Sequence, residues 1–226
     1  SIKSKLLKYN KIKEFKNQKL QQAKDAIDKI DYSLSVMRDK TLFYDPNELV
    51  HALNNIDFCL EIASLPYFPS LIQMGNYSDP FFKLEFEDMV KCSKQDNMFL
   101  DFYKKNIDKI LESKPDLVGV SINSSTQIVS ALTLCVLLKK KKNLKVAIGG
   151  NFFSRLTDSI KKYPKFFKHF CDFILLEEGE IPLLKLCEYL DKKIDISQVP
   201  NLMYLSGKKI IQNEMCKPLD LQHHQS

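Results

Sequence analysis

Apolar residues recur with two different periods along this chain. In the first half they return every three or four positions, which is the period of one face of a helix. This spacing predicts three helices, over residues 2–36, over residues 45–64, and from about Asp96 to just before Lys114. A largely helical first half is therefore expected.

Two local signals shape this half. Asp45, Pro46 and Glu48 supply an N-cap aspartate, a proline at the first helical position and a glutamate at the third, which is typical of a helix N-terminus. Residues 65–82 hold three prolines among five tyrosines and phenylalanines, so we expect an irregular, aromatic-rich loop there. Such a loop covers either a ligand or part of the core.

From residue 116 onward, short apolar runs alternate with amphipathic stretches. The runs predict strands at residues 116–122, 144–148 and 173–176, and the stretches predict helices at residues 126–138, 152–163 and 180–190. Two more short runs, 203–205 and 209–211, flank Ser206-Gly207 and predict a hairpin.

Repeated strand-turn-helix units imply a parallel sheet with helical crossovers. The sequence therefore predicts an α/β fold, a Rossmann- or flavodoxin-like parallel sheet flanked by helices, with a helical N-terminal extension and a C-terminal β-hairpin. We expect residues 1–95 to form the extension with its aromatic loop and residues 96–216 to form the α/β domain.

Each predicted parallel strand ends in a polar or glycine-containing turn, which is where open α/β sheets bind ligands. Residues 121–127 hold six small polar side chains, whereas one helix cap needs only one of them. The surplus favours hydrogen bonds to a neutral ligand over capping alone. Gly149 and Gly150 end the second strand and let a bulky group approach the backbone. Glu177 to Glu180 follow the third strand, where capping of the next helix is the alternative interpretation.

Charge and composition exclude several classes of function. The net charge of +6 is accounted for by residues 1–30, which hold nine lysines and three acidic residues. Without an arginine cluster or stacking aromatic residues beside them, we expect no nucleic-acid or membrane partner. No apolar run is long enough for a membrane span, and no signal-peptide pattern is present, so a cytoplasmic location is expected.

Several sequence motifs are missing. The six cysteines form no CxxC or CxxxCxxC pattern, so we expect reduced, mostly packed thiols and no metal site. The GxGxxG and Walker A motifs of nucleotide-binding folds are also missing. A nucleotide-binding flavodoxin-like enzyme therefore ranks lowest among the candidate functions.

The order of the turns resembles a known family. Its pattern is carried by Lys114-Pro-Asp-Leu-Val-Gly-Val-Ser121, Gln127, Ile148-Gly-Gly150, Cys171-Asp-Phe-Ile-Leu-Leu-Glu-Glu-Gly-Glu180 with Pro182-Leu183, and Val199-Pro-Asn-Leu-Met-Tyr204. Over residues 96–221 the chain resembles the N-terminal cobalamin-binding domain of cobalamin-dependent radical SAM enzymes. Residues 30–80, with Phe43-Tyr-Asp-Pro46, more loosely resemble the subset associated with peptide maturation.

The resemblance implies the ligand and its contacts. Cobalamin would be held by the three turns, through Ser121, Asn123, Ser124, Thr126 and Gln127, through Gly149, Gly150 and Asn151, and through Glu177, Gly179 and Glu180. The DxHxxG motif is missing and His51, His169, His223 and His224 stand in no such context, so cobalt would bind without a histidine ligand.

The resemblance also implies what lies beyond the domain. A [4Fe-4S] cluster and S-adenosylmethionine would belong to a downstream radical SAM barrel, reached through residues 217–226 as a linker, and two more parallel strands would lie upstream. This chain would then be an accessory domain, not catalytic alone, of a methyltransferase or peptide maturase, with its own barrel and a precursor peptide as partners. The alternative is an α/β docking module that holds no cofactor and binds a peptide or partner domain.

Overall fold

The computed structural model describes residues 22–95 and 97–216. The expected linker at residues 217–226 and most of the first expected helix lie outside the described residues. Contacts within the chain form two compact units, of which the first ends at Phe82 and the second begins at Lys83. Each unit is described by itself.

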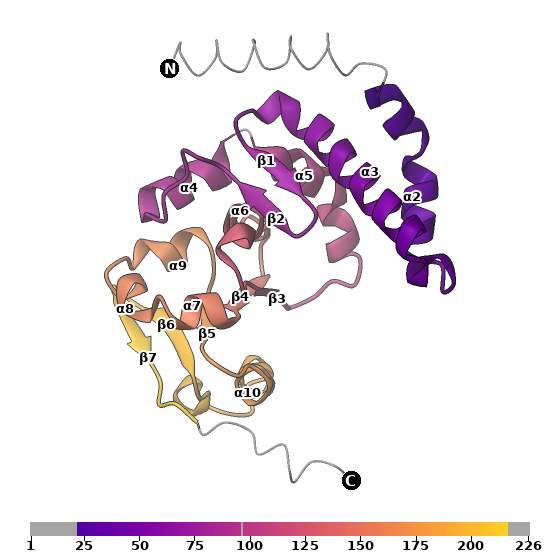
Figure 1. Ribbon diagram of the computed structural model, residues 1–226. Helices are drawn as coiled ribbons and strands as arrows, with labels where there is room; N and C mark the ends of the chain where they lie inside the picture. Colours follow the sequence, from indigo (N-terminus) through magenta and orange to yellow (C-terminus); the bar gives the residue numbers. More distant parts are fainter. Residues whose placement is uncertain (1–21, 96, 217–226) are drawn as a thin grey trace. The chain divides into compact units, whose positions relative to one another are not determined.

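Two packed helices form the main body of the first unit (Figure 1). Residues 22–28 are helical, a turn follows at Lys29, and α2 spans Ile30–Val36. After the 3-10 helix η1 (Leu42–Tyr44), α3 spans Pro46–Ser64. The predicted start is confirmed, because the Asp45 side chain accepts hydrogen bonds from the N–H groups of Asn47 and Glu48.

The expected irregular segment contains a hairpin that the sequence did not reveal. After η2 (Leu65–Tyr67), the strands β1 (Leu71–Gln73) and β2 (Asn76–Ser78) pair in antiparallel fashion. Gly75 has a φ of 73° in the turn between them. Strands of three residues are too short to show the alternation of polar and apolar residues that identifies longer strands.

The second unit contains a five-stranded sheet in the order β3-β4-β5-β6-β7 (Figure 1). Its strands are β3 (Leu117–Ser121), β4 (Lys145–Gly149), β5 (Phe173–Leu175), β6 (Leu202–Ser206) and β7 (Lys209–Gln212). The first three are parallel, as predicted, and β6 and β7 form the predicted hairpin. The hairpin continues the same sheet, since β6 pairs antiparallel with β5. The α/β fold class is thus confirmed.

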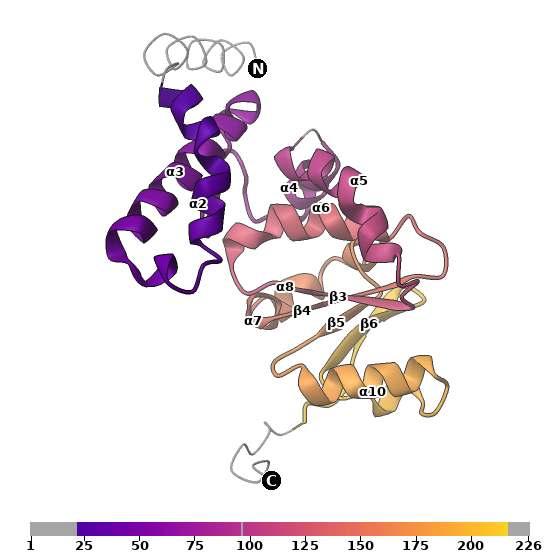
Figure 2. The same ribbon diagram turned by 90° about the vertical axis from the view of Figure 1, so that its right-hand side faces the viewer.

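Helices cover both faces of this sheet (Figure 2). On one face lies α6 (Ile128–Leu138), against which α4 (Phe86–Lys94) and α5 (Met98–Leu111) pack. On the other face lies α10 (Glu180–Leu190). The sequence predicted α5, α6 and α10 but no element at α4. No helix in the described part of the chain is long and apolar enough to cross a membrane.

The prediction of one helix over residues 152–163 is wrong. Three short helices connect β4 to β5 instead, namely α7 (Asn151–Ser154), α8 (Thr157–Ile160) and α9 (Lys165–His169). The Thr157 hydroxyl donates a hydrogen bond to the Ser154 carbonyl oxygen at 2.8 Å, which is the competition with regular helix bonding that Ser and Thr side chains create. Packing of aromatic rings, such as Phe153 on Phe166 with centroids 5.6 Å apart, holds the short turns in place.

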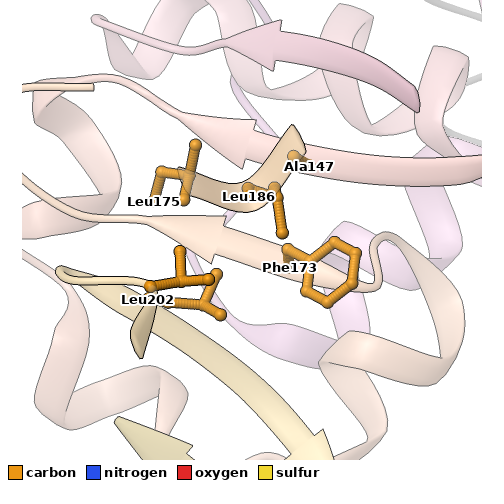
Figure 3. Packing of buried hydrophobic residues seen from close by; sticks show 6 residues of the cluster. Ala147, Phe173, Leu175, Leu186 and Leu202 are labelled. Carbon is orange, nitrogen blue, oxygen red and sulfur yellow. The ribbon is translucent and has the colours of Figure 1, made fainter. Parts of the chain in front are cut away.

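The hydrophobic core beneath α10 fixes the sheet and that helix together. Ala147, Phe173, Leu175, Leu186, Val199 and Leu202 form one buried cluster (Figure 3). Leu186 comes from α10 and is fully buried, while the others come from β4, β5, β6 and the segment just before β6. This packing sets the distance between the start of α10 and the ends of the parallel strands.

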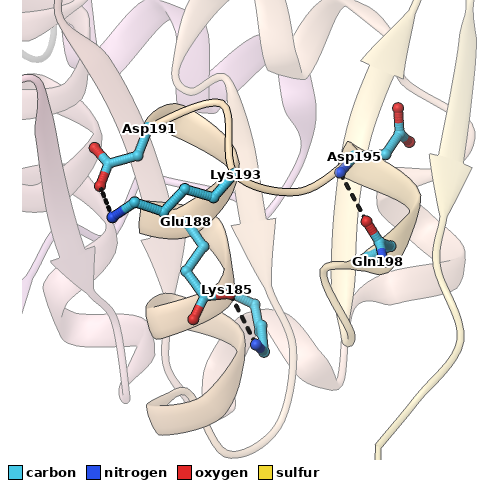
Figure 4. Close-up of polar contacts among 6 residues, drawn as sticks. All are labelled: Lys185, Glu188, Asp191, Lys193, Asp195 and Gln198. Atoms are coloured by element: carbon cyan, nitrogen blue, oxygen red, sulfur yellow. Dashed lines mark hydrogen bonds and ion pairs between the residues drawn. The ribbon is translucent and has the colours of Figure 1, made fainter.

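Surface polar contacts lie on α10 and in the segment that follows it (Figure 4). Lys185 pairs with Glu188 at 2.8 Å and Lys193 with Asp191 at 2.8 Å. Asp195 forms a capping box with Gln198 around the 3-10 helix η4 (Ile196–Gln198). Since exposed ion pairs contribute about 0–1 kcal/mol each, these contacts direct the loop more than they stabilise the fold.

Candidate functional site

The turn after β3 is built largely from its own side chains. Ser124 caps the 3-10 helix η3 (Ser125–Gln127), its Oγ accepting from the Thr126 N–H at 3.3 Å. The Gln127 Oε1 accepts from the backbone N–H groups of Asn123 at 2.8 Å and Ser124 at 3.2 Å, which completes a capping box. The sequence suggested that residues 121–127 hold more polar side chains than one helix cap needs. In the structure, most of these polar groups are engaged in hydrogen bonds within the turn.

A second set of contacts joins this turn to the one that follows β4. The Asn151 N–H donates to Asn123 Oδ1 at 3.2 Å, and the Ile122 N–H donates to the Gly149 carbonyl oxygen at 2.8 Å. Gly150 has a φ of 98°, and a Cβ at this position would lie 2.5 Å from the Ile122 carbonyl oxygen. Only glycine fits there, so Gly150 lets the two turns touch.

A trough of about 410 Å³ lies beside these turns, between the ends of the parallel strands and the start of α10. Its lining comes from β3, from β4 and the turn after it, from the end of β5 and the turn after it, and from the first turn of α10. The lining residues are Gly119, Val120, Ser121, Ala147, Gly149, Gly150, Leu175, Glu177, Gly179, Glu180 and Leu183. The volume falls in the range of about 300–1,000 Å³ that is usual for ligand sites.

The floor of the trough consists of the smallest residues of the sheet. Alternate residues of a strand share a face, which places Gly119 with Ser121 on β3 and Ala147 with Gly149 on β4. The parallel register sets Gly119 beside Ala147 and Ser121 beside Gly149. A Cβ added at Gly119 would meet no atom within 4 Å. The face of the sheet is therefore open at this point.

The walls of the trough are apolar on one side and acidic on the other. Leu183 of α10 is 41% exposed, and its neighbour Leu184 is 59% exposed. Glu177 and Glu180 are the charged residues of the lining, and no lysine or arginine is among the lining residues. A ligand with a terminal phosphate would therefore meet carboxylates without a compensating cation.

The acidic wall also carries an unusual backbone conformation. Glu177 has a φ of 54°, in the left-handed region that non-glycine residues rarely adopt, and its N–H donates to Ser154 Oγ at 2.8 Å. Such a conformation costs on the order of 1–2 kcal/mol. Gly179 precedes the first residue of α10 and has no side chain with which to cap the helix. Backbone donors and carboxylate acceptors thus lie next to each other at this end of the trough.

The structure divides the expected site residues into two groups. Ser121, Gly149, Gly150, Glu177, Gly179 and Glu180 line the trough. Asn123, Ser124, Thr126, Gln127 and Asn151 lie in the adjoining turns and do not line it. Their expected ligand contacts stay a prediction. Sequence reasoning missed Ala147, Leu175 and Leu183, and it placed no ligand contact at Gly119, although the two-residue spacing from Ser121 was a usable signal.

The described histidines and cysteines lie elsewhere. His51 belongs to α3 in the first unit, and His169 contacts Lys94 from α9, with its Nδ1 3.2 Å from the Lys94 Nζ. Burial raises the pKa of the Cys135 thiol to about 12 and also raises the pKa of Cys171. All six cysteines are free thiols, of which Cys187 is exposed. Within residues 22–95 and 97–216, no group of three or more His, Cys, Asp or Glu residues could hold a metal ion.

Comparisons with known proteins give a partial structural likeness. No protein-family profile matches the chain, and no curated protein sequence matches it. One similar solved structure is the cobalamin-dependent S-adenosylmethionine radical enzyme OxsB with aqua-cobalamin and S-adenosylmethionine bound, which is 21% identical at a TM-score of 0.41. Another is the radical S-adenosylmethionine methyltransferase TsrM from Kitasatospora setae, 17% identical at a TM-score of 0.41.

The likeness covers about half of this chain and a small share of the others. It spans 51% of this chain and 16% of OxsB, and 53% of this chain and 24% of TsrM. A likeness of this degree does not decide which ligand this chain binds.

Proposed function

We propose that the second unit is a cobalamin-binding accessory domain of a radical SAM enzyme, a methyltransferase or peptide maturase. The observation that carries this proposal is the trough at the ends of the parallel strands, with its open glycine floor. The turn sequences that resemble cobalamin-binding domains border the same trough. The geometry and the turn sequences thus support the same place in the molecule.

The residues present fit this ligand chemically. The edge of a corrin carries neutral amides, each with hydrogen-bond donors and an acceptor. Glu177 and Glu180 offer acceptors, and the Ser121 hydroxyl offers both a donor and an acceptor. Backbone N–H groups in the first turn of α10 offer donors. The trough holds one part of so large a ligand, and the bare floor at Gly119 and Gly149 admits a flat or bulky group.

In this proposal, Ser121, Gly149, Gly150 and the residues from Glu177 to Glu180 hold the ligand. Cobalamin supplies a cobalt centre that carries a methyl group or tunes a radical step. The cobalt would carry no histidine ligand from this domain, in which neither His51 nor His169 lines the trough. The [4Fe-4S] cluster and S-adenosylmethionine belong to a separate radical SAM barrel, which is the proposed partner together with a precursor peptide.

A second candidate function is a docking module for a peptide. It is favoured by the exposed leucines of α10 and by the edge strand β3, whose outer side pairs with no other strand in the described part of the chain. An extended peptide could add a strand at such an edge. Peptide binding without any corrin binding would support this candidate.

Titration of the full chain with hydroxocobalamin tests the main proposal. We expect the corrin absorption bands to shift at micromolar protein, with co-elution in gel filtration. FMN, which carries a terminal phosphate, is the matched control and should not bind, because the trough offers no cation. Absence of a spectral change and of co-elution at high micromolar protein would contradict the proposal, and binding of FMN would contradict the chemistry assigned to the trough.

A further inference from the structure

The short helix α7 is joined to each of the three turns that border the trough. It begins directly after Gly150, in the turn that follows β4. The Phe152 N–H donates to the Ile122 carbonyl oxygen at 3.2 Å, which joins α7 to the turn after β3. Ser154 Oγ accepts from the Glu177 N–H at 2.8 Å, which joins α7 to the turn after β5. The last residue of α7 is thus the link to the acidic wall.

Packing and a second hydrogen bond fix Ser154 at the end of α7. Its neighbour Phe153 is fully buried and packs on Phe166 of α9, with ring centroids 5.6 Å apart. The Thr157 hydroxyl donates to the Ser154 carbonyl oxygen at 2.8 Å. Closely packed surroundings leave such a residue little freedom to shift. The position of the Ser154 hydroxyl is therefore set by its own segment and not by the turn that it contacts.

Glu177 needs support because its backbone conformation is unfavourable. Its φ of 54° lies in the left-handed region, where the Cβ of a non-glycine residue crowds the following carbonyl oxygen. A residue keeps such a conformation only where its surroundings enforce it. Leu176, directly before it, is buried and donates its N–H to the Asn201 carbonyl oxygen at 2.9 Å. The chain is therefore anchored at Leu176 by β6, and at Glu177 by Ser154.

The conformation of Glu177 decides where the acidic wall lies. Glu177 lines the trough, and so does Glu180 at the start of α10. If Glu177 adopted the extended region, the chain would leave β5 in another direction and the carboxylate would move with it. Ser154 itself does not line the trough. Its influence on a ligand would therefore pass through Glu177.

We propose that Ser154 is a positioning residue for ligand binding in the trough, whose hydroxyl holds Glu177 in the left-handed conformation and so keeps the acidic wall in place. The inference rests on the proposed function, since the ligand concerned is the corrin. The property that matters is the hydroxyl oxygen as an acceptor, which threonine keeps and alanine lacks.

A double-mutant cycle on hydroxocobalamin affinity tests the inference in the full chain. Ser154→Ala should lower the affinity by about fivefold, the loss expected when one hydrogen bond is removed. The same change in a Glu177→Gly background should alter the affinity by less than about twofold, because the carboxylate that Ser154 positions is gone. A merely structural role would lower the affinity equally in both backgrounds, and that result would overturn the inference.

Two further variants serve as controls. Ser154→Thr keeps the acceptor and should bind within about twofold of the natural chain. Ser159→Ala removes a serine hydroxyl from α8, outside the trough, and should bind as the natural chain does. Equal affinities of Ser154→Ala and the natural chain would overturn the inference and leave the proposed function standing. A loss in Ser159→Ala as large as that in Ser154→Ala would contradict the specific role of Ser154.

Hydrogen exchange of the Glu177 amide, followed by ¹⁵N NMR, gives a readout that needs no ligand. In Ser154→Ala this amide should exchange severalfold faster, whereas the Leu176 amide, bonded to Asn201, should keep its rate. If the natural chain fails to bind hydroxocobalamin, the proposed function is contradicted, while the exchange rates still decide whether Ser154 holds Glu177. An unchanged rate at Glu177 in Ser154→Ala would overturn the inference.

Discussion

The turn after β3 and the floor of the trough beside it differ in the side chains that they carry and in the space that they leave for a ligand. The turn, residues 121–127, is crowded with polar side chains, which bond mainly to one another and to the next turn. The part of the floor formed by Gly119 and Gly149 carries no side chain, and it leaves the open surface. Polar side chains near strand ends thus build the shape of a site, and the space comes from residues that are small.

The largest change in stability is expected at the contact between the two turns. Gly150→Ala places a Cβ 2.5 Å from the Ile122 carbonyl oxygen in a residue with a φ of 98°. We expect the free energy of unfolding to fall by about 2–3 kcal/mol, from left-handed strain and the displaced turn. Urea denaturation followed by far-UV circular dichroism measures this. Gly179→Ala is the control, since a Cβ there meets nothing within 4 Å, and equal losses in both variants would contradict the assignment.

A smaller loss of stability is expected from a substitution within the turn after β3. Gln127→Ala removes the acceptor of the Asn123 and Ser124 N–H groups, and loss of such a cap costs about 0.5–2 kcal/mol. Because that oxygen is already engaged, corrin affinity should change by less than about threefold. Calorimetry of unfolding and a corrin titration measure the two quantities. A tenfold loss of affinity in a folded variant would show that the turn side chains contact the ligand directly, as the sequence suggests.

Glu177→Gly should raise the stability of the fold, whereas the two preceding variants lower it. Glycine adopts a φ of 54° without steric cost, so we expect stability to rise by about 1 kcal/mol. Corrin binding should weaken at the same time, because a carboxylate is removed from the lining of the trough. Glu178→Gly, at a position without positive φ, is the control and should not gain stability. A loss of stability in Glu177→Gly would contradict the strain described here.

The smallest effect is expected at His169, away from both regions. Burial, and then the charges of Lys94 on α4 and Lys165 on α9, lower the pKa of His169. The unfolded chain therefore binds a proton at higher pH, near the ordinary pKa of about 6.5. The stability that neutral His169 contributes is present above that pH and is lost as the pH falls towards the lowered pKa of the folded state.

Denaturation at pH 7.5 and pH 5.5 measures this effect. His169→Gln should lose less stability between the two pH values than the natural chain does. Corrin affinity of the two proteins should stay alike, since His169 does not line the trough. A steeper pH dependence in the variant would contradict the direction assigned to the pKa.

Much of the fold could be predicted because strong local signals agree with the final packing. Asp45 and Pro46 start α3 as expected, and the apolar runs at β3, β4 and β5 lie within one residue of the predicted strands. Prediction was wrong at residues 152–163, where buried aromatic rings and a threonine hydroxyl outweigh helical spacing. The antiparallel pairing of β6 with β5 joins strands that are far apart in the sequence, so no local sequence pattern predicts it.

The candidate site could be predicted only in outline. Glycines and acidic residues at strand ends indicated the right edge of the sheet, and Gly149, Glu177 and Glu180 do line the trough. Leu175 and Leu183 were missed because an apolar residue in a strand or helix carries no sign of whether it faces the core or a ligand. That distinction depends on where α10 packs, through the buried cluster to which both Leu186 and Ala147 belong.

The most direct test of the central claim is the corrin affinity of Gly119→Val. Valine suits a strand and its Cβ meets nothing within 4 Å, so the fold should be kept while the side chain fills the floor of the trough. Val118→Ile, on the same strand but not in the lining, is the matched control. We expect Gly119→Val to lower hydroxocobalamin affinity at least tenfold with unchanged or higher stability, and Val118→Ile to bind normally. Normal binding by folded Gly119→Val would contradict the claim that the trough is the site.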